Sequence, residues 1–172
     1  CDFLVQEGEI VPFVLTYGAS HRSIPEPIDA IAALSATTEF WREWSSRSTY
    51  RGRWVEAVQR SLITLKALTY MPTGGILAAA TTSIPEEPRG PRNWDYRFCW
   101  LRDATFTLLA LMNAGYYEEA SAWQDWLLRA IAGDPAQAQI MSGVAGERQL
   151  AAWEVPGLPG YVGAGPVRIG KA

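Results

Sequence analysis

The chain has 172 residues, 48 % hydrophobic and 19 % charged, which is ordinary for a globular protein except for its eight Trp residues. A formal net charge of −3 and a single His provide no basic stripe, which argues against binding to nucleic acid or to an anionic membrane surface. Cys1 and Cys99 offer neither a disulfide framework nor metal-ligand spacing, and no apolar run reaches membrane-spanning length.

The first twenty residues are expected to contain two short strands. Residues 1–5 and 9–17 are rich in aliphatic and aromatic side chains, and Gly8 marks a turn between them. Two strands cannot bury a face by themselves, so we expect them to belong to a larger sheet. Since the sequence opens in this way and without Met, we expect an excerpt of a longer protein. A linker rich in Ser and Pro follows Gly18, and its His21 is expected to be solvated.

Two amphipathic helices are predicted next. The first begins at Pro27, because proline is favoured at the first helical position, and its inward face consists of Ile28, Ile31, Leu34, Thr38 and Trp41. The second spans residues 54–69 and stops before Pro72, with an apolar stripe of Val55, Val58, Leu62 and Leu65. Residues 76–82 are then expected to form a short strand or an extended loop.

An aromatic segment follows, in which Trp94, Tyr96, Phe98 and Trp100 recur at every second position. In an extended backbone these rings share one face, and Asp95, Arg97 and Cys99 point to the other. Arg102 and Asp103 then place a donor fork beside a carboxylate, a pairing that can grip adjacent hydroxyls of a sugar. The alternative is a packed strand with a local ion pair or helix cap. The density of charges among the rings favours a polar ligand, because unpaired buried charges are costly.

Two further helices are predicted after this segment. Asp103 stands where an N-cap would, and residues 104–115 form a helix that is apolar nearly all round, which predicts an inner, buried position. The next helix spans residues 117–131 and ends at Gly133 and Pro135. Its inward side chains are expected to be Ala120, Trp123, Leu127 and Ile131, and its outward ones Glu118, Glu119, Gln124 and Asp125. An inner helix followed by an outer one suggests a double ring of helices, whereas patterning fades beyond residue 133.

Residues 93–104 resemble the signature of glycoside hydrolase family 15, the family of glucoamylases, glucodextranases and bacterial trehalases. Residues 65–70, 72–74, 79–83, 139–141, 146–148 and 166–170 resemble other blocks of this family in the right order, so the resemblance covers nearly the whole chain. It implies a mainly α fold, a partial (α/α)6 toroid of the six-hairpin glycosidase type with a few short N-terminal β-strands. Residues 1–20 would end a β-sandwich, 21–50 would form a linker and linker helix, and 51–172 would form the first part of the barrel.

The same resemblance implies which residues bind substrate. Arg102 and Asp103 would hydrogen-bond the 4- and 6-hydroxyls of the non-reducing-end glucose, Trp100 would lie against its ring, and Tyr96 would line the pocket near the scissile bond. Phe98 is expected to pack the wall, and Trp94, Asp95 and Arg97 to brace it. Arg168 either closes the pocket or pairs with a carboxylate.

No catalytic residue is carried over, because the family's general acid and base are glutamates on later barrel loops. Glu147 and Glu154 are acidic residues of the tail, but a solvated position, or for Glu147 an ion pair with Arg148, is the favoured interpretation. Departures from the family pattern at Ala152, Gly157, Gly165 and Lys171 put the tail's part in the pocket in doubt.

The resemblance therefore implies a fragment of an inverting, exo-acting α-glucoside hydrolase without an organic cofactor, whose partner is an α-glucoside or oligosaccharide substrate. Trehalose, maltodextrin and dextran stay open as substrates, as do the compartment and the oligomeric state. The alternative is a non-catalytic carbohydrate-binding remnant or truncated product, and the isolated chain is expected to show no turnover.

Overall fold

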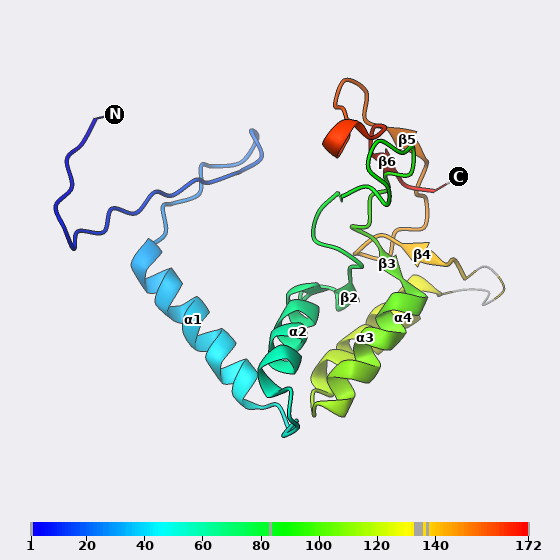
Figure 1. The fold of residues 1–172 in the computed structure, drawn as a ribbon, viewed down its shortest axis with the longest axis horizontal. Helices are drawn as coiled ribbons and strands as arrows, with labels where there is room; N and C mark the ends of the chain where they lie inside the picture. Colours follow the sequence, from blue (N-terminus) through cyan, green and yellow to red (C-terminus); the bar gives the residue numbers. More distant parts are fainter. Residues whose placement is uncertain (1, 83, 133–135, 137, 172) are drawn as a thin grey trace. The chain divides into compact units, whose positions relative to one another are not determined.

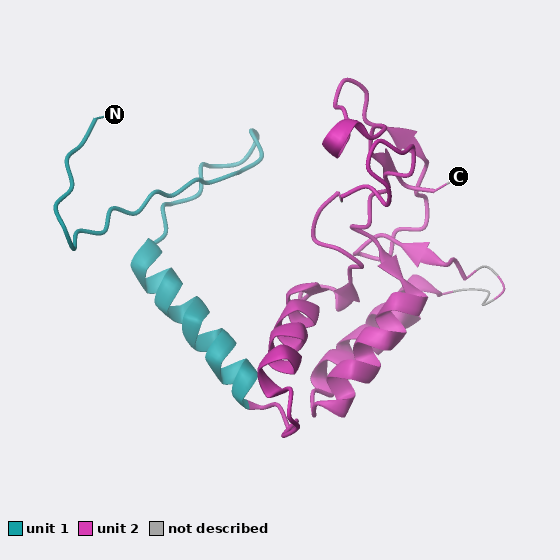
Figure 2. Ribbon diagram, in the orientation of Figure 1, with its two compact units in different colours: residues 1–46 teal, residues 47–172 magenta. Residues whose placement is uncertain are grey.

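The computed structural model describes residues 2–82, 84–132, 136 and 138–171. It divides into two compact units, residues 1–46 and residues 47–172 (Figure 2). Helices are the main regular elements of both units, and the strands are two residues long (Figure 1). The mainly α class predicted from the sequence is therefore confirmed.

The predicted N-terminal strands are wrong for the described residues, because the chain between residues 2 and 29 forms no β-ladder. It does reverse direction where the Glu9 backbone N–H donates to the Gln6 carbonyl at 3.1 Å, and the rings of Phe3 and Phe13 meet at 5.6 Å. Most of its apolar side chains are exposed, with Leu4 at 99 %. A pair of extended segments without a further sheet has no face to bury, which explains the missing ladder.

Helix α1 (Ala30–Ser46) begins three residues later than Pro27. The Asp29 carboxylate accepts hydrogen bonds from the backbone N–H groups of Ile31 and Ala32, both at 3.0 Å, and so caps the first turn. This cap sets the start of the helix and leaves the proline in the linker.

Helix α2 (Val55–Ala67) lies within two residues of its predicted limits, and Leu62 on its stripe is buried. It leads into an antiparallel pair of β1 (Thr69–Tyr70) and β2 (Gly75–Ile76). Of the predicted strand or extended loop at residues 76–82, only the first residue belongs to a strand.

Helix α3 (Leu101–Asn113) directly follows β3 (Cys99–Trp100). Its N-cap is Trp100, which is extended with φ −97° and ψ 133°, so the prediction of Asp103 as N-cap is wrong and this carboxylate lies in the first turn. The predicted burial all round is also wrong for this chain: Ala104 and Leu111 are buried, but Phe106 is 67 % exposed. Apolar composition alone does not supply the neighbours that would cover this face.

Helix α4 (Glu118–Ala130) lies beside α3, and its side chains build the main core (Figure 1). Trp126, Cys99 and Ala130 form the buried cluster, against which Leu77, Leu101, Trp123, Leu127 and Val144 pack. Glu119 was predicted to face outward but is 3 % exposed, because Lys66 on α2 approaches its carboxylate to 2.9 Å. The predicted helix stops at Gly133 and Pro135 lie outside the described residues.

The tail folds back onto the aromatic segment through short antiparallel pairs. Strand β4 (Met141–Ser142) pairs with β3, and β5 (Trp153–Glu154) pairs with β6 (Arg168–Ile169). A short 3-10 turn, η2 (Tyr161–Gly163), lies between β5 and β6. Much of the tail, which was expected to need partners from elsewhere, is therefore held by residues of this chain.

Candidate functional site

The aromatic segment is held on both sides by backbone hydrogen bonds. On one side, the N–H groups of Ala78 and Ala79 donate to the carbonyls of Phe98 and Tyr96 at 3.0 and 3.1 Å. On the other side, Arg168 donates its N–H to the Asn93 carbonyl at 2.8 Å and accepts from the Asp95 N–H at 2.9 Å. An extended segment whose N–H and C=O groups are paired in this way presents its side chains in fixed directions.

Three of the four alternating rings lie close together. Tyr96 and Trp100 lie 5.5 Å apart between centroids, and Phe98 meets the edge of Trp100 at 6.3 Å. All three rings are half-buried, whereas Asp95 and Cys99, at the intervening positions, are 4 % and 1 % exposed. The rings therefore offer partly open apolar faces, as a stacking surface requires.

Asp95 braces the segment from its buried side. Its carboxylate accepts three hydrogen bonds from Arg97: from the backbone N–H at 2.9 Å, from Nε at 3.0 Å and from Nη2 at 2.9 Å. The hydrogen bond to this carboxylate also raises the pKa of Arg97. These contacts fit the bracing role predicted for the two residues, which stays a prediction.

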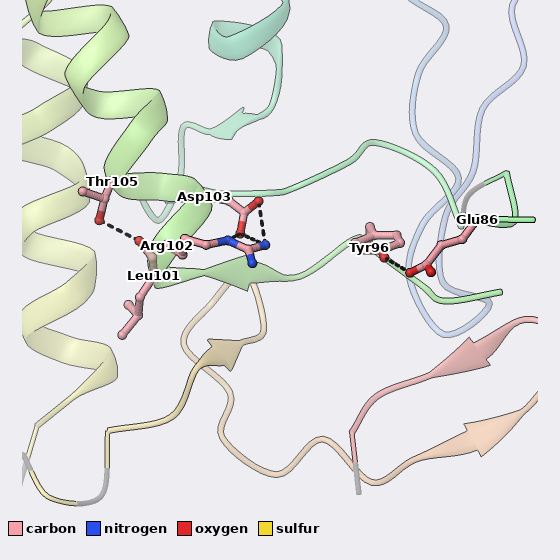
Figure 3. Close-up of polar contacts among 6 residues, drawn as sticks. All are labelled: Glu86, Tyr96, Leu101, Arg102, Asp103 and Thr105. Carbon is pink, nitrogen blue, oxygen red and sulfur yellow. Dashed lines mark hydrogen bonds and ion pairs between the residues drawn. The ribbon is translucent and has the colours of Figure 1, made fainter. Parts of the chain in front are cut away.

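Arg102 and Asp103 form an exposed pair in the first turn of α3 (Figure 3). Arg102 donates from Nε to Oδ2 at 3.2 Å, and from Nη2 to Oδ2 at 3.0 Å and Oδ1 at 3.3 Å. The two side chains are 75 % and 39 % exposed. These bonds use Nε and Nη2 of Arg102 and both oxygens of Asp103, and the exposed surface of both side chains can still meet a ligand. The pair has the donors and acceptors that neighbouring hydroxyls need.

A cleft of about 480 Å³ opens beside this pair. It is lined by Trp100, Leu101, Arg102, Ala138, Gln139 and Ile140. This volume is within the range of about 300 to 1,000 Å³ that is usual for small-molecule sites. Of the four predicted site residues, Trp100 and Arg102 line the cleft. Tyr96 and Asp103 do not line it, but they contact Trp100 and Arg102 respectively.

Tyr96 is held by a residue that the sequence did not single out. Its hydroxyl donates to Oε1 of Glu86 at 3.0 Å (Figure 3). Burial raises the pKa of Tyr96, and the hydrogen bond and negative charge of Glu86 raise it further. Glu86 stands in the run Pro85-Glu86-Glu87-Pro88, which carries no periodicity and precedes Tyr96 by ten positions, so no local pattern could have found this contact.

The family model described as "Glycosyl hydrolases family 15" matches residues 52–172. The chain belongs to glycosyl hydrolases family 15. It is 42 % identical over 171 residues to a trehalase of Mycobacterium tuberculosis, a match that covers 97 % of this chain and 25 % of the relative. It is 38 % identical over 158 residues to a trehalase of Thermoplasma acidophilum, which covers 92 % of this chain and 27 % of the relative. The chain thus spans about a quarter of the length of these curated relatives, and no solved structure matches it.

In this family 15 chain, Glu147 and Arg148 do not pair with each other in the described structure. Glu147 is exposed, and its Oε2 accepts the backbone N–H of Ala145 at 3.0 Å. Arg148 donates instead to the carbonyls of Ala130 and Ala132, at 2.8 and 2.6 Å, where α4 ends. The solvated interpretation of Glu147 thus fits the structure and the ion-pair interpretation does not.

Arg168 and Phe98 make contacts that the sequence did not predict. The Arg168 guanidinium lies 5.8 Å from the ring centroid of Trp94, a cation–π contact, and its two predicted roles stay predictions. Phe98 lines a second, separate groove of about 410 Å³ together with Asp95, Arg97, Gly143, Val144, Glu147, Gln149, Leu150 and Ile169. Phe98 thus borders a different groove from Trp100, although the two rings are in contact, and its expected place in the wall of the glucose pocket stays a prediction.

The described part of this family 15 chain shows neither a metal-binding cluster nor a membrane-spanning helix. Among the described residues, no three His, Cys, Asp or Glu side chains come together in a way that could hold a metal ion. No helix in the described ranges combines the length and apolarity needed to cross a bilayer.

Proposed function

We propose that this chain supplies a glucose-binding subsite to an inverting, exo-acting α-glucoside hydrolase. The observation that carries the proposal is the exposed Arg102–Asp103 pair beside Trp100 at the edge of a cleft. Arg102 and Asp103 hydrogen-bond the 4- and 6-hydroxyls of the non-reducing-end glucose. Trp100 stacks on the apolar C–H face of the ring, and Tyr96 lines the pocket next to it.

The architecture proposed for the whole protein follows from membership of the family. Residues 51–172 form the first part of an (α/α)6 toroid in which α3 is an inner helix and α4 an outer one. Residues 1–20, whose described part forms no β-ladder in this chain, complete a β-sandwich in the full protein by pairing with strands outside this chain, and residues 21–50 link the two domains. In this arrangement the first turn of α3, with Arg102 and Asp103, opens toward the active-site funnel.

Trehalose is the substrate that we propose. The relatives from both Mycobacterium and Thermoplasma are named trehalases, although they are only 42 % and 38 % identical to this chain. Inverting hydrolysis needs two carboxyl groups about 6.5 to 9.5 Å apart, one to protonate the leaving oxygen and one to activate water. In our proposal both are contributed by barrel segments other than this chain, which binds and orients the glucose unit. No organic cofactor takes part.

The test is an assay of the protein that contains this chain on trehalose, maltotriose and isomaltose side by side. We expect the highest kcat/KM on trehalose. Arg102→Ala should lower kcat/KM about 10- to 100-fold, the size of a lost hydrogen bond to a charged partner. Arg60→Ala is the matched control, because Arg60 is an exposed arginine on α2.

Three outcomes would contradict the proposal. Hydrolysis of none of the three sugars would exclude the hydrolase, and retained sugar binding without turnover would favour the carbohydrate-binding remnant. Equal activity of Arg102→Ala and Arg60→Ala would show that this pair does not grip the substrate.

A further inference from the structure

Glu86 collects three donors from the segment that carries the rings. Its Oε1 accepts from the Tyr96 hydroxyl and from Trp94 Nε1, both at 3.0 Å, and its Oε2 lies 3.3 Å from Arg92 Nε. Its backbone N–H donates to the Arg92 carbonyl at 3.1 Å, which ties the loop before the aromatic segment to the start of that segment. One carboxylate thus joins two of the four alternating aromatic side chains.

The ion pair with Arg92 does not account for this arrangement. The Arg92 and Glu86 side chains are 60 % and 38 % exposed, and exposed pairs of this kind contribute about 0 to 1 kcal/mol. The hydrogen bonds to Tyr96 and Trp94 engage the other carboxylate oxygen and two partly buried rings. We therefore expect the main effect of Glu86 to be on the positions of the Tyr96 and Trp94 rings.

We propose that Glu86 is a positioning residue for the glucose-binding subsite, acting through the Tyr96 hydroxyl; this inference rests on the proposed function. A phenol has one proton to donate and lone pairs with which to accept. Because the Tyr96 hydroxyl already donates its hydrogen bond to Glu86, its oxygen can only accept a hydrogen bond from a ligand. Tyr96 therefore selects a sugar hydroxyl that donates.

The same contact fixes the place of the Tyr96 ring. Tyr96 lies 5.5 Å from Trp100, so a shift of its ring would also disturb the stacking surface at the cleft. The charges of Glu86 and Asp103 raise the pKa of Tyr96, and the charge of Arg102 lowers it. Glu86 thereby couples the loop at residues 84–90 to the pair that grips the sugar.

The experiment uses the full protein with trehalose as the probe, and compares three variants with wild type. Glu86→Ala should lower kcat/KM about tenfold, mainly through KM, which is the effect of one lost hydrogen bond in substrate binding. Glu86→Gln should stay within about threefold, because its amide oxygen still accepts from both rings. Glu87→Ala, at the neighbouring exposed glutamate, should match wild type.

A double-mutant cycle separates positioning from a purely structural role. In a Tyr96→Phe background, Glu86→Ala should change kcat/KM by less than about twofold, because the hydroxyl through which it acts is gone. A full effect of Glu86→Ala in that background would overturn the inference. If Glu86→Ala does not fold, Glu86→Asp replaces it, since the shorter side chain keeps the charge but cannot reach both ring donors, and the same cycle applies.

The two proposals fail in different ways. If Arg102→Ala and Tyr96→Phe both bind and hydrolyse trehalose as wild type does, the proposed subsite is wrong and the role of Glu86 is lost with it. If those two variants are impaired while Glu86→Ala is not, the subsite stands and only the positioning role is refuted.

Discussion

At the scale of single residues, the thiol of Cys99 shows how the core behind the aromatic segment behaves. Cys99 is 1 % exposed, and burial raises its pKa to about 12, although a hydrogen bond from the backbone of Ile76 works in the opposite direction. A thiol reacts with alkylating reagents as the thiolate. We therefore expect Cys99 to resist iodoacetamide in the folded protein at pH 9, and to react readily when the protein is unfolded in urea.

The same shift has a consequence for stability. Because the folded state holds the proton of Cys99 more tightly than the unfolded state, the contribution of this group to stability is complete below about pH 9 and is lost as the pH rises toward about 12.

Peptide mapping by mass spectrometry measures the alkylation of Cys99 by iodoacetamide. Equal rates of Cys99 modification in the folded and unfolded protein at pH 9 would contradict the buried position.

At the scale of elements, the turn after α3 depends on Gly115. Its φ of 92° is in the left-handed region, and the bonds from Gly115 N–H to Met112 and from Tyr116 N–H to Leu111, at 3.0 and 2.9 Å, close a Schellman motif. A Cβ at this position would lie 2.8 Å from Cγ2 of Thr49. Gly115→Ala should therefore lower the free energy of unfolding by about 1 to 2 kcal/mol for the backbone, plus the cost of the overlap.

Gly157 provides the matched control for this substitution. Its φ is 79°, but no atom lies within 4 Å of a Cβ built there. Gly157→Ala should show the backbone cost alone, so Gly115→Ala should give the larger drop in melting temperature. Thr49→Ser, which removes the crowding methyl group, should recover part of the loss. Equal destabilisation at the two glycines would mean that the Thr49 contact does not matter.

Helices α2, α3 and α4 could be located from sequence to within about three residues, because their periodicity is a local property of the chain. The features that could not be predicted from the sequence depend on contacts with residues far away in the chain. Glu119 is buried because Lys66 meets it from another helix, and Glu86 joins the site through a loop without regular structure. Residues 1–17 carry a strand pattern, but these residues pair with no strand of the described chain.

The candidate site was foreseeable in its composition but not in its contacts. The alternation of rings and the adjacent Arg102 and Asp103 follow from the sequence, and the structure brings Trp100 and Arg102 to one cleft. The N-cap assigned to Asp103 failed because Trp100, in an extended conformation, already ends the strand and starts the helix. The residue types thus predicted which side chains belong to the candidate site, whereas the junction between β3 and α3 determined how these side chains are arranged.

At the scale of the whole molecule, the exposed apolar face of α3 should make the isolated chain behave differently from the full protein in which we propose it works. Phe106, Leu109 and Met112 are 67 %, 56 % and 39 % exposed at successive three-residue steps. A contiguous apolar face of this kind favours association in water. We expect the 172-residue chain produced by itself to elute above its monomer mass of 19.0 kDa in size-exclusion chromatography with light scattering, and to show no hydrolysis of trehalose.

Charged substitutions on this face should have opposite effects in the two contexts. In the isolated chain, Phe106→Lys with Leu109→Lys should restore the monomer, because it breaks the apolar face. In the full protein, where α3 is proposed as an inner helix, the same pair should lower the melting temperature, because it buries two charges without partners. Ser121→Lys with Gln124→Lys on α4, the proposed outer helix, is the control, since both side chains are exposed. If the α3 pair leaves the full protein as stable as this control does, the face is open to solvent there too, and α3 is not an inner helix of a toroid.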